Sequence, residues 1–107
     1  MPTIKKFNYT WADGATPVNF MDWVNELSPA ERLEFDLADA RQNELRQQHQ
    51  DQGTLLDVSE SIESPQHVWQ NEESAKTGNK SDPVWTRYFD RYLAETNTTF
   101  TITYEEQ

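Results

Sequence analysis

The chain has 107 residues, nineteen of them acidic and nine basic, which gives a formal charge of −10 at pH 7. This length suits one domain, so we expect residues 1–107 to share a single core. The chain has no cysteine, which excludes disulfides, thiolate metal sites and a cysteine nucleophile.

The first predicted element is a strand over Thr3–Trp11. Phe7, Tyr9 and Trp11 alternate with polar residues, and a period of two is typical of a strand with one buried face. Asp13-Gly14 then predicts a turn that ends the strand.

Two helices are predicted after this turn. The first has Thr16 as its N-cap, with a proline in its first turn, and runs to about Leu27. A break follows at Ser28, because the residue before a proline is disfavoured in the helical region. Ser28 and Glu31 form a capping box, so we expect the second helix to begin at Pro29.

The second helix has an apolar stripe followed by a long polar end. Its stripe is Ala30, Leu33, Leu37 and Ala40 at helical spacing, with Phe35 and Ala38 beside it, and we expect this side of the helix to face the core. Residues 41–52 are almost wholly polar, and a glycine follows as a natural end of the helix. This polar segment either projects into solvent or lies along a partner.

Two further strands and a loop come next. Thr54–Ile62 predicts a strand with Leu56, Val58 and Ile62 on one face. A third strand is expected over His67–Glu72. A single helical turn over 72–75 is an alternative conformation for the residues that follow this strand. Ser74 to Asp82 has the composition of a loop.

The strongest helical pattern lies near the C-terminus, over Asp82–Ala94. An aspartate and a proline begin it, and five large apolar residues share one face: Trp85, Tyr88, Phe89, Tyr92 and Leu93. An alternating segment over Thr98–Glu105 predicts the last strand.

This order of elements, βαββαβ, predicts a ferredoxin-like α+β sandwich. Such a fold has a four-stranded antiparallel sheet with its helices on one face. The bare face is expected to carry Leu55 and either Val68 or Trp69, an apolar patch that water tolerates poorly. A second copy packed sheet against sheet would cover it, so we expect a homodimer.

The segments 68–75 (VWQNEESA) and 81–88 (SDPVWTRY) carry a family resemblance. Together with the element order, they resemble the dimeric α+β barrel superfamily, which includes antibiotic-biosynthesis-monooxygenase-like and stress-responsive barrel proteins. The resemblance implies a dimeric barrel. In the cofactor-free monooxygenases of that family, it implies a pocket for a polycyclic substrate that itself activates oxygen. The chain differs in its first helical region, 17–52, which is longer than in the family.

The candidate site residues come from the same C-terminal region. His67, Asn71 and Arg87 are the candidates for catalysis, His67 because histidine titrates near neutral pH. A ligand pocket between helices and sheet would be lined by three large rings, although these rings serve equally well to fill a core. They are Trp69, Trp85 and Tyr88.

Other classes of site lack their patterns. No histidine or carboxylate spacing suits a metal, and the three glycines form no phosphate loop, so we expect neither a metal nor a cofactor. The negative charge disfavours nucleic acid and anionic membranes as partners. The start of the chain lacks the apolar run of a signal peptide, and we expect a soluble, cytoplasmic protein.

Three functions remain open from the sequence. The first is a dimeric α+β barrel that binds a small apolar or aromatic ligand, or nothing at all. The second is a cofactor-independent monooxygenase-like enzyme. The third is an interaction protein that docks a partner through the polar helix end, residues 41–52.

Overall fold

The computed structural model describes residues 1–59, 65–78 and 82–107 of the chain. Within these ranges the chain is an α+β fold with a four-stranded antiparallel sheet and four helices. In chain order the elements are β1 (Thr3–Trp11), α1 (Phe20–Asn25), α2 (Pro29–Asp51), β2 (Leu55–Ser59), β3 (Gln66–Trp69), α3 (Glu72–Thr77), α4 (Pro83–Thr96) and β4 (Thr98–Glu106).

The strands lie in the order β2-β3-β1-β4, and every neighbouring pair is antiparallel. The central strand β1 pairs along its whole length with β4 and over its first residues with β3. This register places Lys5 between His67 of β3 and Tyr104 of β4. The side chains of these three residues therefore share one face of the sheet.

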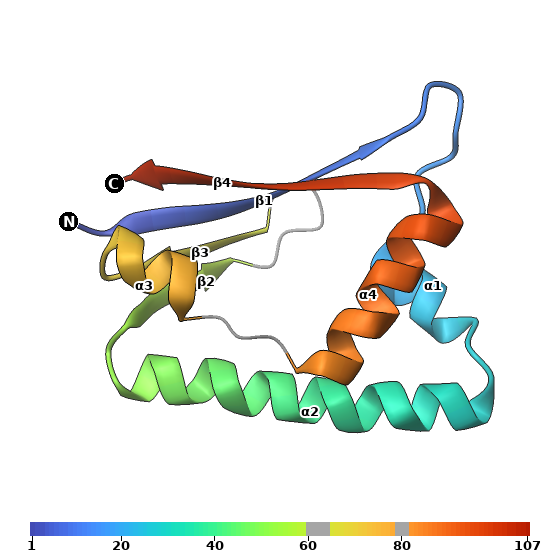
Figure 1. Cartoon of the computed structure of the whole chain (residues 1–107), viewed down its shortest axis with the longest axis horizontal. Helices are drawn as coiled ribbons and strands as arrows, with labels where there is room; N and C mark the ends of the chain where they lie inside the picture. The colour runs from blue at the N-terminus through green and yellow to red at the C-terminus, as the bar shows by residue number, and fades with distance from the viewer. Residues whose placement is uncertain (60–64, 79–81) are drawn as a thin grey trace.

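The helices lie on one side of the sheet, as Figure 1 shows. The long helix α2 runs along the far side of the molecule from the sheet, and α4 stands between α2 and β4 at one end, beside α1. The short helix α3 packs at the other end, against β1, β3 and β4. The helical layer thus contacts the sheet at two places, through α4 at one end and through α3 at the other.

Two separate hydrophobic clusters correspond to these two ends. Val24 of α1, Phe35 of α2 and Tyr88 of α4 form one cluster. At the other end, Leu55 and Trp69 of the sheet pack against Ala75 of α3. Leu55 and Trp69 therefore lie on the helix-covered face of the sheet, and not on the bare face where an apolar patch was expected.

The outer face of the sheet is mostly polar. Alternation along β1 places Ile4, Lys6, Asn8 and Thr10 there, beside the threonines of β4 at odd positions. Val68 of β3 is opposite Ile4 on this face.

Several sequence signals coincide with helix ends in the structure. Ser28 caps α2: its Oγ accepts from the Glu31 backbone N–H at 3.3 Å and donates to the Glu31 carboxylate at 3.0 Å. Gly53 follows the C-cap of α2 with a φ of 77°. Asp82 caps α4, and the predicted strands over Thr3–Trp11 and Thr98–Glu105 correspond to β1 and β4.

The first helix is shorter than predicted. It begins at Phe20, and its N-cap is Asn19, whose Oδ1 accepts from the Met21 N–H at 2.8 Å, instead of Thr16. Pro17 consequently precedes the helix. Asparagine is as good a cap as threonine, and the sequence pattern alone did not separate them.

The orientation of α2 was also predicted wrongly. Leu33 and Leu37 are 62% and 56% exposed, and the buried residues of α2 are Phe35, Ala38 and Gln42. The reason is that α2 meets α4 through Phe35, whose ring contacts Tyr88 at a centroid distance of 5.9 Å, with polar pairs such as Glu34 and Arg87 beside it, so the stripe of Leu33 and Leu37 is turned away from the contact.

The second and third strands differ from their predictions in detail. A bulge between Leu55 and Asp57 exposes Leu56 and places Val58 on the face of Leu55. Positions 60–62 of the predicted second strand lie outside the described residues. The third strand ends at Trp69, because Asn71 caps α3 instead of continuing the strand. The loop predicted from Ser74 was therefore wrong over its first residues, since α3 continues to Thr77.

No helix in the described ranges combines the length and apolar character needed to cross a membrane.

Candidate functional site

A cavity of about 870 Å³ lies between the sheet and the helices, in the region that separates the two hydrophobic clusters. Its lining comes from β1, β3 and β4 of the sheet and from α1, α2 and α4 of the helical layer. The cavity is partly open to solvent, because exposed residues such as Met21, Asn43 and Ile102 belong to its lining.

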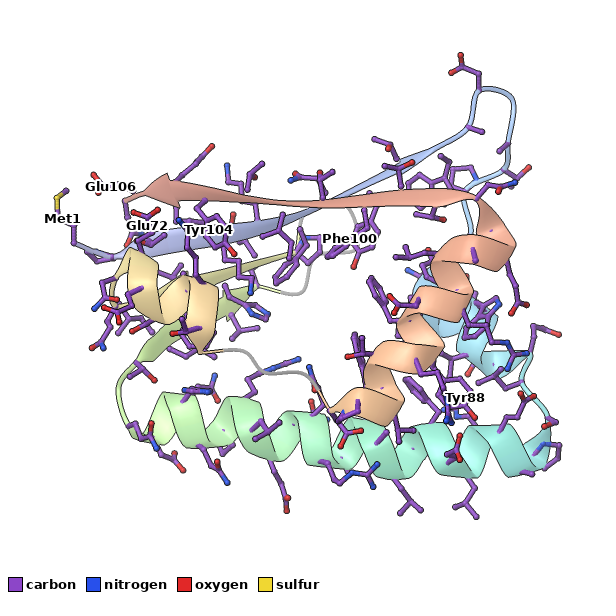
Figure 2. The ribbon with its side chains drawn as sticks, viewed as in Figure 1. Met1, Glu72, Tyr88, Phe100, Tyr104 and Glu106 are labelled. Atoms are coloured by element: carbon purple, nitrogen blue, oxygen red, sulfur yellow. The ribbon has the colours of Figure 1, made fainter. Side chains whose placement is uncertain are left out.

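The sheet wall of the cavity is aromatic. Phe7, Tyr9 and Trp11 of β1 line it at alternate positions, with Phe100 of the neighbouring strand β4. The Phe100 ring stacks on Phe7 at a centroid distance of 6.0 Å and contacts Tyr9 at 5.1 Å. Figure 2 shows Phe100 on the side of β4 that faces the helices.

The helix wall is aromatic as well. Phe20 of α1 contacts Trp85 and Phe89 of α4 at centroid distances of 5.5 and 5.3 Å. Phe89 in turn meets the edge of Phe100 at 5.0 Å and of Tyr9 at 6.3 Å. These ring contacts close the cavity at the α4 end and give both of its walls a flat, apolar surface.

Two basic side chains lie on the sheet side of the cavity. Lys5 is 6% exposed and His67, opposite it in the register, is 9% exposed. The Lys5 ammonium lies 5.6 Å from the centroid of the Phe7 ring, and the His67 ring meets Phe7 edge to face at 4.9 Å. Burial lowers the pKa of Lys5.

Burial also raises the pKa of Tyr9 to about 12, with a smaller contribution from Tyr92. The phenol of Tyr9 is therefore neutral across the physiological range and contributes a hydroxyl to the cavity without a charge.

The carboxylates of the lining come from the helices. Asp22, Asp39 and Asp90 belong to α1, α2 and α4. Asp39 accepts a hydrogen bond from the Trp85 indole N–H at 3.2 Å, which fixes the plane of that ring. The helix side also has one basic residue, Arg46 of α2, so aspartates outnumber basic residues there, whereas the charged residues described on the sheet side are basic.

Of the six residues selected from the sequence, His67 and Trp85 line the cavity. Trp69 does not: it is 1% exposed and packs on Leu55, Ala75 and the ring of His49. Trp85 thus lines the cavity while Trp69 is part of a hydrophobic cluster, and the prediction that both line one pocket was wrong for Trp69.

Tyr88 also belongs to a core instead of the cavity. Figure 2 shows it at the contact of α4 with α2, where its hydroxyl donates to Glu34 at 2.8 Å. Burial, together with the Glu34 carboxylate, raises the pKa of Tyr88.

The other two catalytic candidates have structural roles at the surface. Asn71 caps α3, with its Oδ1 accepting from the Ser74 N–H at 2.8 Å. Arg87 is exposed on α4 and pairs with Glu34 of α2. The structure therefore does not bring Asn71 or Arg87 together with His67.

Sequence reasoning missed the basic residue of the cavity, Lys5. The signal was present, because Lys5 has the same parity along β1 as Phe7, Tyr9 and Trp11 and must share their face. A lysine on the aromatic face of a strand is unusual, since lysine is seldom buried without a partner.

In the described parts of the chain, no three histidine or acidic side chains gather closely enough to hold a metal ion. Comparisons of the chain with protein-family models, with curated proteins and with solved structures found no match.

Proposed function

We propose that this protein binds a small apolar or aromatic molecule in the cavity between its sheet and its helices. The observation that carries the proposal is a cavity of about 870 Å³ with aromatic rings on both walls. Small-molecule sites are mostly apolar clefts of about 300–1,000 Å³ with a few polar groups, and this cavity has both properties.

The physical argument concerns packing. Protein interiors are close-packed, and an empty apolar volume forfeits dispersion contacts on all of its walls. Here the sheet and helix layers meet at their ends, while Phe7, Tyr9 and Trp85 border open volume between them. A flat ligand would restore contacts with these rings without moving either layer.

For the architecture, we propose a ferredoxin-like arrangement of the kind found in dimeric α+β barrels. The strand order β2-β3-β1-β4, with antiparallel neighbours and helices on one side, supports it. The homodimer stays a prediction. Its sheet-to-sheet form would bring Lys6, Asn8 and Thr10 into the interface, with Ile4 and Val68 as apolar contacts. Sedimentation at micromolar concentration tests it, and a mass of 12.6 kDa would contradict it.

Ligand binding is favoured over the two alternatives. A monooxygenase-like reaction would rely on His67 alone among the catalytic candidates, because Asn71 and Arg87 lie outside the cavity. Docking through residues 41–52 is disfavoured, because Gln42 is buried and His49 packs on Trp69 of the same chain.

The proposal is tested with N-phenyl-1-naphthylamine, a neutral aromatic probe whose fluorescence rises in apolar surroundings. We expect saturable binding to the native protein and a higher midpoint of thermal unfolding, because a ligand of the native state stabilises it. The variant Phe100→Gln places a polar amide in the cavity and is expected to weaken binding at least about fivefold, the factor that corresponds to roughly 1 kcal/mol.

Thr101→Gln is the matched control, since Thr101 neighbours Phe100 on the same strand but points to the outer face. It should leave the affinity unchanged. An absence of saturable binding, or an equal loss in both variants, would contradict a ligand site in the cavity.

A further inference from the structure

Lys5 is a buried cation with no counter-charge among the residues that the structure describes. It is 6% exposed, lies on the central strand of the sheet and lines the cavity. The Lys5 ammonium forms no salt bridge or hydrogen bond with any of the described residues, and it is placed over the Phe7 ring. The adjacent lysine, Lys6, points to the opposite face and pairs with Glu105 at 2.9 Å.

This arrangement is costly for the empty protein. Removing an ammonium from water is unfavourable unless a carboxylate or several acceptors replace the water, and one aromatic face replaces little of it. Among the described residues of the cavity lining, the carboxylates are on the helices, and none of them forms an ion pair with Lys5. A cation kept in this position is suited to an anion supplied from outside.

The distribution of charge defines the orientation of such an anion. Lys5 and His67 lie on the sheet side, whereas the charged residues of the helix side are three aspartates, Asp22, Asp39 and Asp90, and one arginine, Arg46. The negative group of a ligand is therefore attracted to Lys5 and repelled by the opposite wall. Next to Lys5 along β1, two aromatic rings, those of Phe7 and Tyr9, provide the surface for an apolar body.

The same charges favour a monoanion. One ammonium balances one carboxylate, whereas a phosphate ester with close to two charges would leave an excess of negative charge beside Lys5 in a chain of charge −10. We propose that Lys5 binds the carboxylate of an aromatic carboxylic acid whose rings lie along Phe7 and Tyr9. This proposal rests on the ligand site proposed above.

A matched pair of probes tests this role. 2-Naphthoate carries a carboxylate, and 2-naphthamide presents the same rings without charge. Both are titrated against the full chain at about 0.15 M salt, where long-range charge effects are screened beyond roughly 8 Å. Binding is followed by calorimetry and by quenching of tryptophan fluorescence. We expect naphthoate to bind at least about tenfold more tightly than naphthamide, a factor worth 1.4 kcal/mol.

The variants locate the effect. Lys5→Met keeps the apolar stem and should remove the preference for naphthoate while leaving naphthamide affinity within about twofold. Lys5→Gln is a second variant without the charge, and circular dichroism verifies that both fold. Lys6→Met is the matched control, because it removes the neighbouring lysine on the outer face. It should preserve the preference.

The outcomes separate the two proposals. Equal affinities for naphthoate and naphthamide in the native protein would overturn the role of Lys5 and leave the proposed ligand site standing. A preference for naphthoate that persists in Lys5→Met and Lys5→Gln would have the same consequence. Failure of both probes to bind would overturn the ligand site and, with it, the role of Lys5.

Discussion

Asp82 and Arg41 join the start of α4 to the middle of α2. The Asp82 carboxylate accepts from the Arg41 guanidinium at 2.7 and 3.3 Å and also from the backbone N–H groups of Val84 and Trp85 at 3.0 and 3.3 Å. The Asp82 N–H donates to the buried Gln42 side chain at 2.7 Å. One residue thus caps a helix and fixes its crossing with another helix.

The first prediction concerns the pH dependence of this contact. The Arg41 guanidinium and the helix N–H groups lower the pKa of Asp82 below its ordinary value. The contribution to stability is therefore present above the unfolded pKa, near ~3.9, and is lost as the pH falls through the folded pKa. Asp82→Asn keeps a capping oxygen without the charge, so it should reduce the urea midpoint at pH 7 and have little effect at pH 2.

Urea unfolding of the native protein and of the Asp82→Asn variant between pH 2 and pH 7 provides the measurement. The same comparison is made in proteins that also carry Arg41→Met. In that background Asp82→Asn should lower the urea midpoint at pH 7 by less, because the Asp82 carboxylate has lost its charged partner. A difference that is the same at every pH would show that the carboxylate charge does not stabilise the fold.

The second prediction concerns Gly78, which follows α3. A Cβ atom at this position would lie 2.5 Å from the Trp69 ring and 2.6 Å from the Ser74 carbonyl oxygen. Because Trp69 is buried and the Ser74 oxygen belongs to the backbone, neither can withdraw easily, and Gly78→Ala should cost about 1–3 kcal/mol.

Equilibrium urea unfolding measures this loss. Gly53→Asn is the control, because Gly53 has a φ of 77° with nothing within 4 Å of a Cβ, and asparagine tolerates that conformation. It should cost well under ~1 kcal/mol. A harmless Gly78→Ala would contradict the packing of α3 on Trp69.

The third prediction concerns Phe89, which joins the two walls of the cavity. Phe89→Ala removes a ring that is 8% exposed and contacts Tyr9, Trp85 and Phe100. We expect a loss of about 3 kcal/mol, at the lower end for a core phenylalanine, because part of the ring borders open volume. Phe35→Ala, at 1% exposure, should cost more in the same unfolding experiment. A loss below ~1 kcal/mol at Phe89 would contradict the contact between α4 and the sheet.

Local signals predicted much of the fold. Strand alternation located β1 and β4, and a cap followed by proline located the starts of α2 and α4, because these features depend on neighbours in the sequence. The face of α2 could not be predicted in this way. Leu33 and Phe35 both belong to helical stripes, and the choice between them depends on the contacts of α2 with the distant α4, where Phe35 packs on Tyr88 and Glu31 pairs with Arg91.

The candidate site was predictable only in part, for a related reason. The aromatic residues were visible, but their division between core and cavity depends on how far the sheet and helices stand apart. Tyr88 and Trp85 are three positions apart on α4 and both contact α2, and yet Tyr88 is buried in the core while Trp85 also borders the cavity. A single helical stripe can thus serve two environments.

The fourth prediction concerns the exposed stripe of α2. Leu33→Gln with Leu37→Gln should change the free energy of unfolding by no more than about 0.5 kcal/mol per site, because both side chains are more than half exposed. Urea unfolding measures the change and sedimentation the mass. A larger loss accompanied by a smaller mass would show that this stripe, instead of the outer sheet face, joins two copies.

The last prediction is that Lys5→Met stabilises the empty protein. Burial lowers the pKa of Lys5, so the unfolded chain holds this proton more readily than the folded one. The penalty is therefore complete below the folded pKa and disappears as the pH rises through the unfolded pKa, near ~10.4. Among the described residues, His67 and Tyr104 are opposite Lys5 in the sheet register, and Asp22, Asp39, Arg46 and Asp90 line the helix side of the same cavity; none of them forms an ion pair with Lys5.

Urea unfolding of the empty protein compares Lys5→Met with the native chain. The variant should unfold at a higher urea concentration at pH 7, and the gap should narrow toward pH 10, where the native lysine loses its charge in the unfolded chain as well. Such a gain would mean that the lysine is retained against stability, as expected of a binding residue. A variant that is less stable at pH 7, with Lys6→Met unchanged, would show that Lys5 has a structural partner and is not held for a ligand.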